Sequence, residues 1–532
     1  MTNAHDWCED AGQHVREEER KRLVQRLYST KALSHLDPRF FFGRGYQGPT
    51  DVAPPCVWES SQTPREDHAT PQWLTASEFS DSPDVAARKI AQLANLMRLS
   101  KHTVVYSGAG ISASVIGQAA RSGTNTQGWL KRGSLREARP TPTHYALGAL
   151  GRAGIVHGWV QQNHDGLPQK AGFPQERINE IHGSWYDPAN PVVKYNGSLK
   201  DAEYDWLERE IRSADLVIAL GTSLGGLNAD RLVSETAARS MQRPRRGGGA
   251  LGSVIINLQQ TPEDGDATLR LFGRTDDMLP PLLTALGVAA VAAVPPTWPR
   301  EPCALVPYSA DGMRLAAGAA GVAPSDMTWL DLRDGARVRI TSGHNIQGAK
   351  QPSFMHIGAP PAVTGVVGQN GVLRRSAPGV GKVVRRDEAS ESFILEIEGT
   401  QMHLGIWWLE AAARGGPAQL PVTNVQEERQ AAEEAVESAA VLRPSALTAV
   451  REAELSAEWD AWAEQVADEK ASDAKVAQGK QQLAKQWFGA LHPTEQAFVK
   501  QLKQLKDKVK ENAAVTKGAQ RTRHSSDSAW FN

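Results

Sequence analysis

A glycine-containing turn follows the apolar run Val104–Tyr106. This turn, Gly108–Ser112, reads Gly-Ala-Gly-Ile-Ser. Small side chains at a strand-to-helix turn let backbone N–H groups approach a pyrophosphate at the start of the helix. The turn lacks the third glycine of the common dinucleotide fingerprint. By itself it is equally typical of a tight strand–helix connection that binds nothing.

Amide, carboxylate and imidazole side chains follow two further runs. Gln162, Asn163 and Asp165 come after a strand expected over Gly154–Gln161, and His182 follows a short β-prone run. At the carboxyl end of a parallel strand, an amide and a carboxylate could hold a carboxamide such as that of nicotinamide. Histidine titrates near neutral pH, so His182 could act as a general base. The ordinary alternatives are an Asn-x-Asp-Gly turn and a structural histidine.

Hydroxyl and amide side chains follow two more apolar runs. Gly221, Thr222 and Ser223 come after Asp215–Leu220, where they suit a phosphate or a ribose. Asn257 lies near the end of another expected strand, Ser253–Leu258. Each of these features is ambiguous when it is taken alone.

The elements that must position these residues alternate between strands and helices. Ser82 and Pro83 begin a predicted helix, and His102–Tyr106 follows as a β-branched strand. The stretches Ala202–Ser213 and Asn228–Ser240 have helical character between the later strands. This alternation predicts an α/β fold with a Rossmann-like, doubly wound parallel sheet.

The order and spacing of these motifs over residues 82–286 resemble the sirtuin (Sir2) family of NAD-dependent protein deacylases. The resemblance implies a Rossmann-type large domain that binds NAD beside a smaller module. His182, Asn163 and Asp165 would be the catalytic residues. The implied NAD-binding residues are Gly108, Ala109, Gly110 and Ser112 at the phosphates, Gln162, Asn163 and Asp165 at the nicotinamide ribose and carboxamide, Gly221, Thr222, Ser223 and Asn257 towards the adenosine, Thr275 and Asp276 near the adenine, and Arg121.

The resemblance also implies the reaction. The acyl oxygen of an acylated protein lysine would attack the ribose carbon that carries nicotinamide, and His182 would take a proton from a ribose hydroxyl. The products would be nicotinamide, the deacylated lysine and O-acyl-ADP-ribose. The segment Pro191–Leu199 resembles the one where sirtuins pair with the substrate backbone, so an extended peptide could add a strand there. The implied substrate-binding residues are Val193, Lys194, Tyr195 and Asn196.

Two features depart from the family pattern. Only Ser184–Asn190 stands where most sirtuins carry a zinc module, and none of these residues is cysteine. We therefore expect no zinc, and a small domain that is either reduced or built from other parts, such as the N-terminal region. In the loop Ile116–Arg121, Ala119 and Ala120 replace the acidic and aromatic residues of the family. NAD could then react with water, or a larger acyl group could fit.

The other regions of the chain have different compositions. Residues 1–81 are predicted to be a partly helical extension with a linker, and residues 287–328 a second linker. Short β-prone runs at 329–410 predict a small SH3-like module; they include Ala336–Thr341, Ala362–Val367 and Met402–Trp408. Residues 411–532 are predicted to be a helical tail with a disordered end. The module or the tail could bind a protein partner.

Composition narrows the possible partners and compartments. The formal net charge is −1, which argues against a globally basic nucleic-acid binder. A nucleic acid stays an open partner because Trp407 and Trp408 lie near arginines, although core tryptophans are the more common explanation. Apolar runs are too short for a membrane span. The cysteines number only three, which favours a reducing intracellular compartment, nuclear or cytoplasmic.

Two other functions remain open from the sequence. The altered loop at 116–121 and the missing zinc module favour an NAD hydrolase or a protein ADP-ribosyltransferase that uses the same site. An NAD-binding scaffold with little turnover is the third possibility, because the C-terminal regions suit partner binding.

Overall fold

The computed structural model describes residues 4–61, 71–116, 135–193, 197, 199–244, 249–289, 296–315, 326–341, 346–347, 366–367, 372–374 and 379–425, with side chains described from Val15 onward except at 346–347, 366–367 and 372–374. All of these residues belong to the first of two compact units, 1–440. The predicted tail beyond residue 425 lies outside the described residues. None of the described helices is long and apolar enough to cross a membrane.

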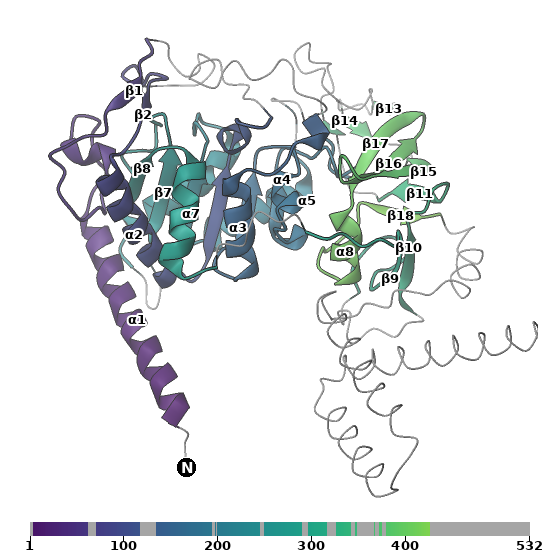
Figure 1. Ribbon diagram of the computed structural model, residues 1–532, viewed down its shortest axis with the longest axis horizontal. Helices are drawn as coiled ribbons and strands as arrows, with labels where there is room; N and C mark the ends of the chain where they lie inside the picture. Colours follow the sequence, from purple (N-terminus) through teal and green to yellow (C-terminus); the bar gives the residue numbers. More distant parts are fainter. Residues whose placement is uncertain are drawn as a thin grey trace, which may run out of the picture. The chain divides into compact units, whose positions relative to one another are not determined.

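A six-stranded parallel sheet forms the centre of residues 82–286 (Figure 1). Its order is β5-β4-β3-β6-β7-β8, so the chain starts in the middle, moves to one edge and then returns to build the other half. This order is that of the Rossmann fold, whose ligands bind where the order reverses. The strands are β3 (Thr103–Ser107), β4 (Gly158–Gln161), β5 (Ile178–Glu180), β6 (Leu216–Leu220), β7 (Gly252–Asn257) and β8 (Leu269–Phe272).

Helices cover both faces of this sheet because its strands are apolar on both sides. Residues such as Val105 and Ile218 pack on α2, α3 and α7, which lie side by side in Figure 1. Their neighbours Val104 and Val217 pack on α5 and α6. The helices are α2 (Pro83–Leu99), α3 (Pro142–Arg152), α4 (Leu167–Lys170), α5 (Asp201–Ser213), α6 (Arg231–Ser240) and α7 (Thr275–Leu286).

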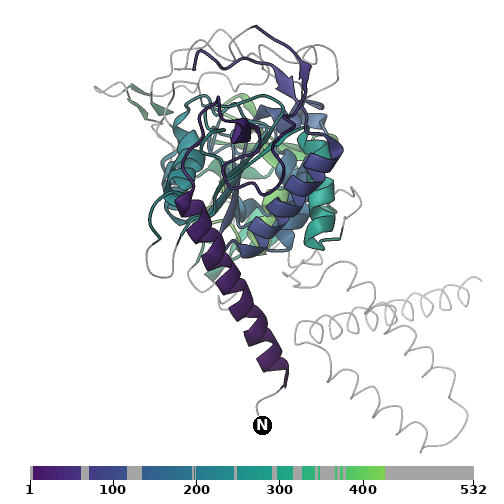
Figure 2. The same cartoon turned by 90° about the vertical axis from the view of Figure 1, so that its left-hand side faces the viewer.

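The N-terminal region covers the β8 edge of the sheet. Helix α1 (Ala4–Ser29) buries Leu27 in the same core as α2 and α7, and its Arg20 pairs with Asp215 at 2.8 Å. The Arg270 amide of β8 donates to the Phe42 carbonyl at 2.9 Å, so the edge strand has a backbone partner. Figure 2 shows α1 extending away from the domain. A short ladder joins β1 (Cys56–Trp58) and β2 (Glu78–Phe79).

A second, β-rich module follows the Rossmann domain. Its main sheet is antiparallel and has the order β17-β16-β15-β11-β18. Helix α8 packs into the same core, where Trp407 and Trp408 are buried, so neither offers a free face for stacking a base. The elements are β9 (Cys303–Val306), β10 (Thr328–Asp331), β11 (Arg337–Ile340), β12 (Ile346–Gln347), β13 (Val366–Val367), β14 (Val372–Arg374), β15 (Val380–Asp387), β16 (Ser392–Ile397), β17 (Thr400–Gly405), α8 (Trp407–Ala413) and β18 (Val422–Asn424).

Three expected boundaries of the β-rich module differ from the structure. Strand β9 pairs with β10, so Cys303–Val306 belongs to the module rather than to the predicted linker. Strand β18 pairs with β11, so the module continues past residue 410. The expected strand Met402–Trp408 ends at Gly405, because Trp407–Ala413 contains Leu, Glu and three Ala and forms a helix instead. SH3-like closure stays a prediction, and Ala362–Val367 is described only at 366–367.

Candidate active site

The glycine turn packs against the end of the neighbouring strand β6. The Gly108 amide donates to the Leu220 carbonyl at 3.1 Å, and the Gly110 amide donates to the Gly221 carbonyl at 2.8 Å. A Cβ on Gly110 would lie 2.7 Å from the Gly221 Cα, which is too close for any side chain. The short helix η2 (Ala109–Ser112) begins directly after Gly108. The turn therefore lies at the point where the strand order reverses.

A buried hydrogen-bond network joins the turn to the loop after β4. The Ser112 hydroxyl donates to the Asp165 carboxylate at 2.7 Å. The Asn163 amide donates to the Gly108 carbonyl at 3.1 Å and to the Ser112 hydroxyl at 3.2 Å. The other Asp165 oxygen accepts from the Leu167 amide at 3.1 Å. These five residues from two segments form one polar floor of the site.

His182 leaves strand β5 beside this floor. The last residue of β4, Gln161, pairs in register with the last residue of β5, Glu180. Asn163 lies two residues after β4 and His182 two residues after β5, so both lie at the same edge of the sheet. Burial, with a smaller contribution from the nearby His164, lowers the pKa of His182 to about 4. The backbone of Gln162 forms a hydrogen bond with the His182 side chain. The imidazole is therefore neutral at pH 7 and can accept a proton.

Residues predicted for the nicotinamide side and for the adenosine side meet around Thr222. The Gln162 amide donates to the Thr222 hydroxyl at 2.9 Å, and the Asn257 amide donates to the Thr222 carbonyl at 3.1 Å. Ser223, the next residue, is exposed. The carboxyl ends of strands β4, β6 and β7 thus lie together. The Gly221–Ser223 turn is therefore bonded both to Gln162, on the predicted nicotinamide side, and to Asn257, on the predicted adenosine side.

Thr275 and Asp276 make contacts of another kind. Both side chains bind Thr143 in the first turn of α3: Asp276 accepts from the Thr143 hydroxyl at 2.6 Å and from its amide at 3.1 Å. The carboxylate therefore caps the start of α3 and joins it to α7. The structure does not bring these two side chains into the network around Ser112 and Thr222.

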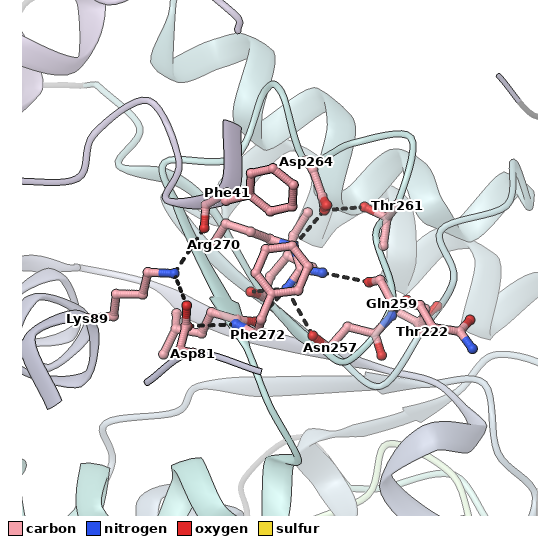
Figure 3. Close-up of polar contacts among 12 residues, drawn as sticks. Phe41, Asp81, Lys89, Thr222, Asn257, Gln259, Thr261, Asp264, Arg270 and Phe272 are labelled. Atoms are coloured by element: carbon pink, nitrogen blue, oxygen red, sulfur yellow. Dashed lines mark hydrogen bonds and ion pairs between the residues drawn. The ribbon is translucent and has the colours of Figure 1, made fainter. Parts of the chain in front are cut away.

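A second network of buried charges fixes the end of β7 (Figure 3). Arg270 of β8 pairs with Asp264 at 2.7 Å and donates to the Asn257 carbonyl at 3.1 Å and the Gln259 carbonyl at 2.6 Å. Next to it, Lys89 of α2 pairs with Asp81 at 2.6 Å. Both pairs are fully buried. Nothing in the local spacing of Arg270, Lys89, Asp81 and Asp264 links these four residues, so the sequence carries no signal for this network.

Further residues outside the predicted site form hydrogen bonds to strand β3 and to the glycine turn. The Trp159 indole donates to the Ser107 hydroxyl at 2.7 Å. His144 is fully buried, and burial lowers its pKa to about 4. Its Nδ1 lies 2.9 Å from the Thr141 hydroxyl, which also donates to the Ile111 carbonyl at 3.3 Å. The Thr-Pro-x-His spacing at the start of α3 could have indicated this capping role.

Part of the predicted site lies outside the described residues. These residues are Arg121, Lys194, Tyr195 and Asn196. Val193 is described, and its amide donates to the His182 carbonyl at 3.1 Å, so the predicted substrate segment begins beside the predicted base. Within the described ranges, no group of three or more His, Cys, Asp or Glu side chains is arranged to hold a metal ion.

These features define a Rossmann-type α/β domain whose polar residues gather at the carboxyl edge of a parallel sheet. The chain belongs to the sirtuin family: it is 30% identical over 265 residues to the NAD-dependent protein deacetylase Sirt6 of Drosophila melanogaster and spans 80% of that protein. The matched residues make up 40% of this chain.

The chain is also similar to two other NAD-dependent protein deacetylases. The chain is 32% identical over 260 residues to the NAD-dependent protein deacetylase SRT1 of Arabidopsis thaliana, covering 40% of this chain and 52% of SRT1. It spans 63% of the bovine NAD-dependent protein deacetylase sirtuin-7, at 29% identity. The chain thus spans only about half to two thirds of these relatives. A solved Sir2 structure is 24% identical, covers 37% of this chain and 98% of its own length, and has a TM-score of 0.31. No family model matches the chain.

Proposed function

We propose that this protein is an NAD-dependent protein-lysine deacylase, which produces nicotinamide, the deacylated lysine and O-acyl-ADP-ribose. One observation carries the proposal: a neutral, largely buried His182 follows β5 beside the network of Asn163, Asp165 and Ser112. Membership of the sirtuin family and relatives that are NAD-dependent protein deacetylases support the same activity.

The residues present fit a bound dinucleotide. The close packing of Gly108 and Gly110 on Gly221 and Thr222 requires that both positions lack a side chain, so the turn can approach a pyrophosphate closely. Ala109, at the tip of the turn, is exposed. Amide groups from Asn163, Gln162 and Asn257 supply donors and acceptors along the rim that joins the two halves of the sheet.

Each residue then has a chemical role. NAD, when bound, supplies the ADP-ribosyl group that takes up the acyl group as nicotinamide leaves. His182 accepts a proton from a ribose hydroxyl, and burial keeps its imidazole in the uncharged base form before that transfer. Asn163 and Asp165 orient the nicotinamide side, and their bonds to Ser112 keep that orientation fixed before binding. Asn257 and Ser223 lie towards the adenosine.

The substrate is proposed to be an acylated lysine in an extended peptide. Val193 already pairs its amide with the His182 carbonyl, so a peptide that continues this pairing would bring its lysine towards the base. Lys194, Tyr195 and Asn196 are the proposed peptide-contacting residues that follow.

The test is product analysis with matched variants. Full-length protein is incubated with NAD and a panel of acylated peptides, and mass spectrometry identifies the NAD-derived product. O-acyl-ADP-ribose is the expected product, and His182→Ala should lose it while calorimetry shows NAD binding retained. His157→Ala serves as the control, because His157 lies at the opposite end of β4. Turnover by His182→Ala at the wild-type rate would refute the proposed role.

A second candidate function is NAD hydrolysis, which is favoured by the small side chains of Ala119 and Ala120. Small side chains there offer less cover to the nicotinamide ribose than the acidic and aromatic residues of the family. Nicotinamide release without any peptide, with free ADP-ribose as the product, would favour the hydrolase. Release that strictly requires acyl-peptide would favour the deacylase.

A further inference from the structure

We propose that the C-terminal β-rich module is part of the active unit, and that two of its residues are positioning residues: Glu391 for the phosphate side of the site and Trp407 for the nicotinamide side. They act on two segments, Leu135–Thr141 and Asn163–Gly166. The inference rests on the proposed function, because the second segment contains Asn163 and Asp165.

The β-rich module encloses the short segment Ser184–Asn190, which stands where most sirtuins carry a zinc module. Tyr186 and Ala189, within Ser184–Asn190, are buried in the core formed by β9–β11, β15–β18 and α8. The Gly405 amide of β17 donates to the Tyr186 carbonyl at 3.1 Å. This part of the chain is thus covered by the C-terminal module, whereas the N-terminal region covers the edge at β8.

Two aromatic rings from this core pack against the loop after β4. The rings of Tyr186 and Trp407 lie 5.1 Å apart between centroids. A Cβ on Gly166 would be 2.7 Å from Tyr186 and 3.0 Å from Trp407. Gly166 has a φ of +65°, a region that favours glycine, and it directly follows Asp165. The Trp407 indole is itself held, because it donates to Gln175 at 2.9 Å. The rings therefore limit how Asp165 can move.

The module also holds the segment Leu135–Thr141, which leads into α3. The Arg136 carbonyl accepts from the Tyr186 hydroxyl at 2.8 Å and from the buried Lys170 ammonium at 2.6 Å. Arg139 forms an ion pair with Glu391, whose side chain is only 6% exposed. At the end of the segment, Thr141 donates to the Ile111 carbonyl of the glycine turn. The segment thus connects the module to the phosphate side of the site.

Glu391 is held in place by hydrogen bonds to both its side chain and its backbone. It has a φ of +54° between β15 and β16, and its second oxygen accepts from the Trp298 indole at 2.8 Å. The Ile406 amide donates to its backbone carbonyl at 3.1 Å, next to Trp407. Because both positioning residues share one rigid core, loss of the Glu391 carboxylate should loosen Leu135–Thr141 without removing any apolar contact.

Amide hydrogen exchange on the ligand-free, full-length protein provides the test. Glu391→Gln and Arg139→Gln should each speed exchange in 135–141, and the double variant should match the single ones because they remove the same pair. Trp407→Phe, which keeps an aromatic ring but loses the indole bond to Gln175, should speed exchange in 163–167. Asp331→Asn is the matched control, since it removes a similarly buried ion pair with Arg333 in the same module, away from the site. Exchange unchanged in both segments would overturn the inference.

NAD affinity and turnover give the functional readout. Glu391→Gln should weaken NAD binding about five-fold or more, the lower end of coupling between linked sites. The KM for NAD should rise more than kcat falls, while Asp331→Asn matches the wild type. If the wild-type protein binds no NAD, the proposed function fails, and the exchange data still decide whether the module holds the two segments. Wild-type NAD affinity in Glu391→Gln and Arg139→Gln would overturn the positioning role.

Discussion

The Ser112 hydroxyl donates a buried hydrogen bond of 2.7 Å to the Asp165 carboxylate, although 53 residues separate the two in the chain. This bond ties the glycine turn after β3 to the loop after β4. Because Asn163 also donates to Ser112, the two segments that contain most of the predicted nicotinamide and phosphate contacts form one unit. The site is therefore organised before any ligand arrives.

Replacing Ser112 by Ala should damage both stability and binding. The change leaves a buried carboxylate oxygen of Asp165 without its donor, which lowers the free energy of unfolding by about 1–3 kcal/mol. NAD affinity measured by calorimetry should fall, because Asn163 and Asp165 lose their common partner. Ser253→Ala is the control: this buried serine has no side-chain hydrogen-bond partner in the described part of the chain. Equal effects of the two variants would contradict the prediction.

Gly110→Ala should abolish the close packing of the turn on β6. The added Cβ would lie 2.7 Å from both the Cα and the carbonyl oxygen of Gly221, so one strand end must shift. We expect NAD binding to be lost and the melting temperature to fall. Gly158→Ala is the matched variant, because its Cβ would meet its nearest neighbour at an ordinary 3.5 Å. Normal NAD binding by Gly110→Ala would show that the turn does not contact the cofactor.

Activity should show no acid limb near the ordinary histidine pKa. Burial lowers the pKa of His182 to about 4, so the base form persists down to that pH in the free enzyme. A plot of kcat/KM against pH reports the free enzyme, and it should stay flat from about pH 8 to about pH 5.5. A drop centred near pH 6.5 would show that His182 is solvated or is not the base.

The contribution of the two buried histidines to stability should be lost as the pH falls, for a related reason. Burial lowers the pKa of His144 and of His182 to about 4 in the folded state, below the value of about 6.5 in an unfolded chain. The unfolded state then binds more protons between these values, so stability present above pH 6.5 is lost towards pH 4. Urea denaturation at several pH values measures this, and His144→Gln should reduce the pH dependence.

The buried pair of Lys89 and Asp81 should be costly to break from one side. Lys89→Met leaves the Asp81 carboxylate buried without its partner, and we expect a loss of about 3–5 kcal/mol in urea denaturation. Adding Asp81→Asn should recover part of that loss. Lys21→Ala is the comparison, since Lys21 forms an exposed pair with Glu18 and its loss should leave stability nearly unchanged. Similar losses for Lys89→Met and Lys21→Ala would contradict the prediction.

Much of the Rossmann domain could be predicted because its signals are local. Apolar runs predicted the strands that became β3, β6 and β7, and Ser82-Pro83 marked the start of α2. The predictions that failed depend on distant partners. Cys303–Val306 looks like linker because its pairing strand is more than twenty residues away, and Trp407 starts a helix because its ring belongs to a core assembled from several segments.

The sequence alone determined the family, the order of the strands along the chain and the identity of the residues at their ends, because these follow from local patterns and spacing. Only the tertiary structure decided which of those residues meet. It brought Ser112 to Asp165, turned Thr275 and Asp276 towards Thr143, and placed Tyr186 and Trp407 against Gly166. Such contacts depend on how strands align and how side chains fill one shared core, and neither can be read from a single stretch of chain.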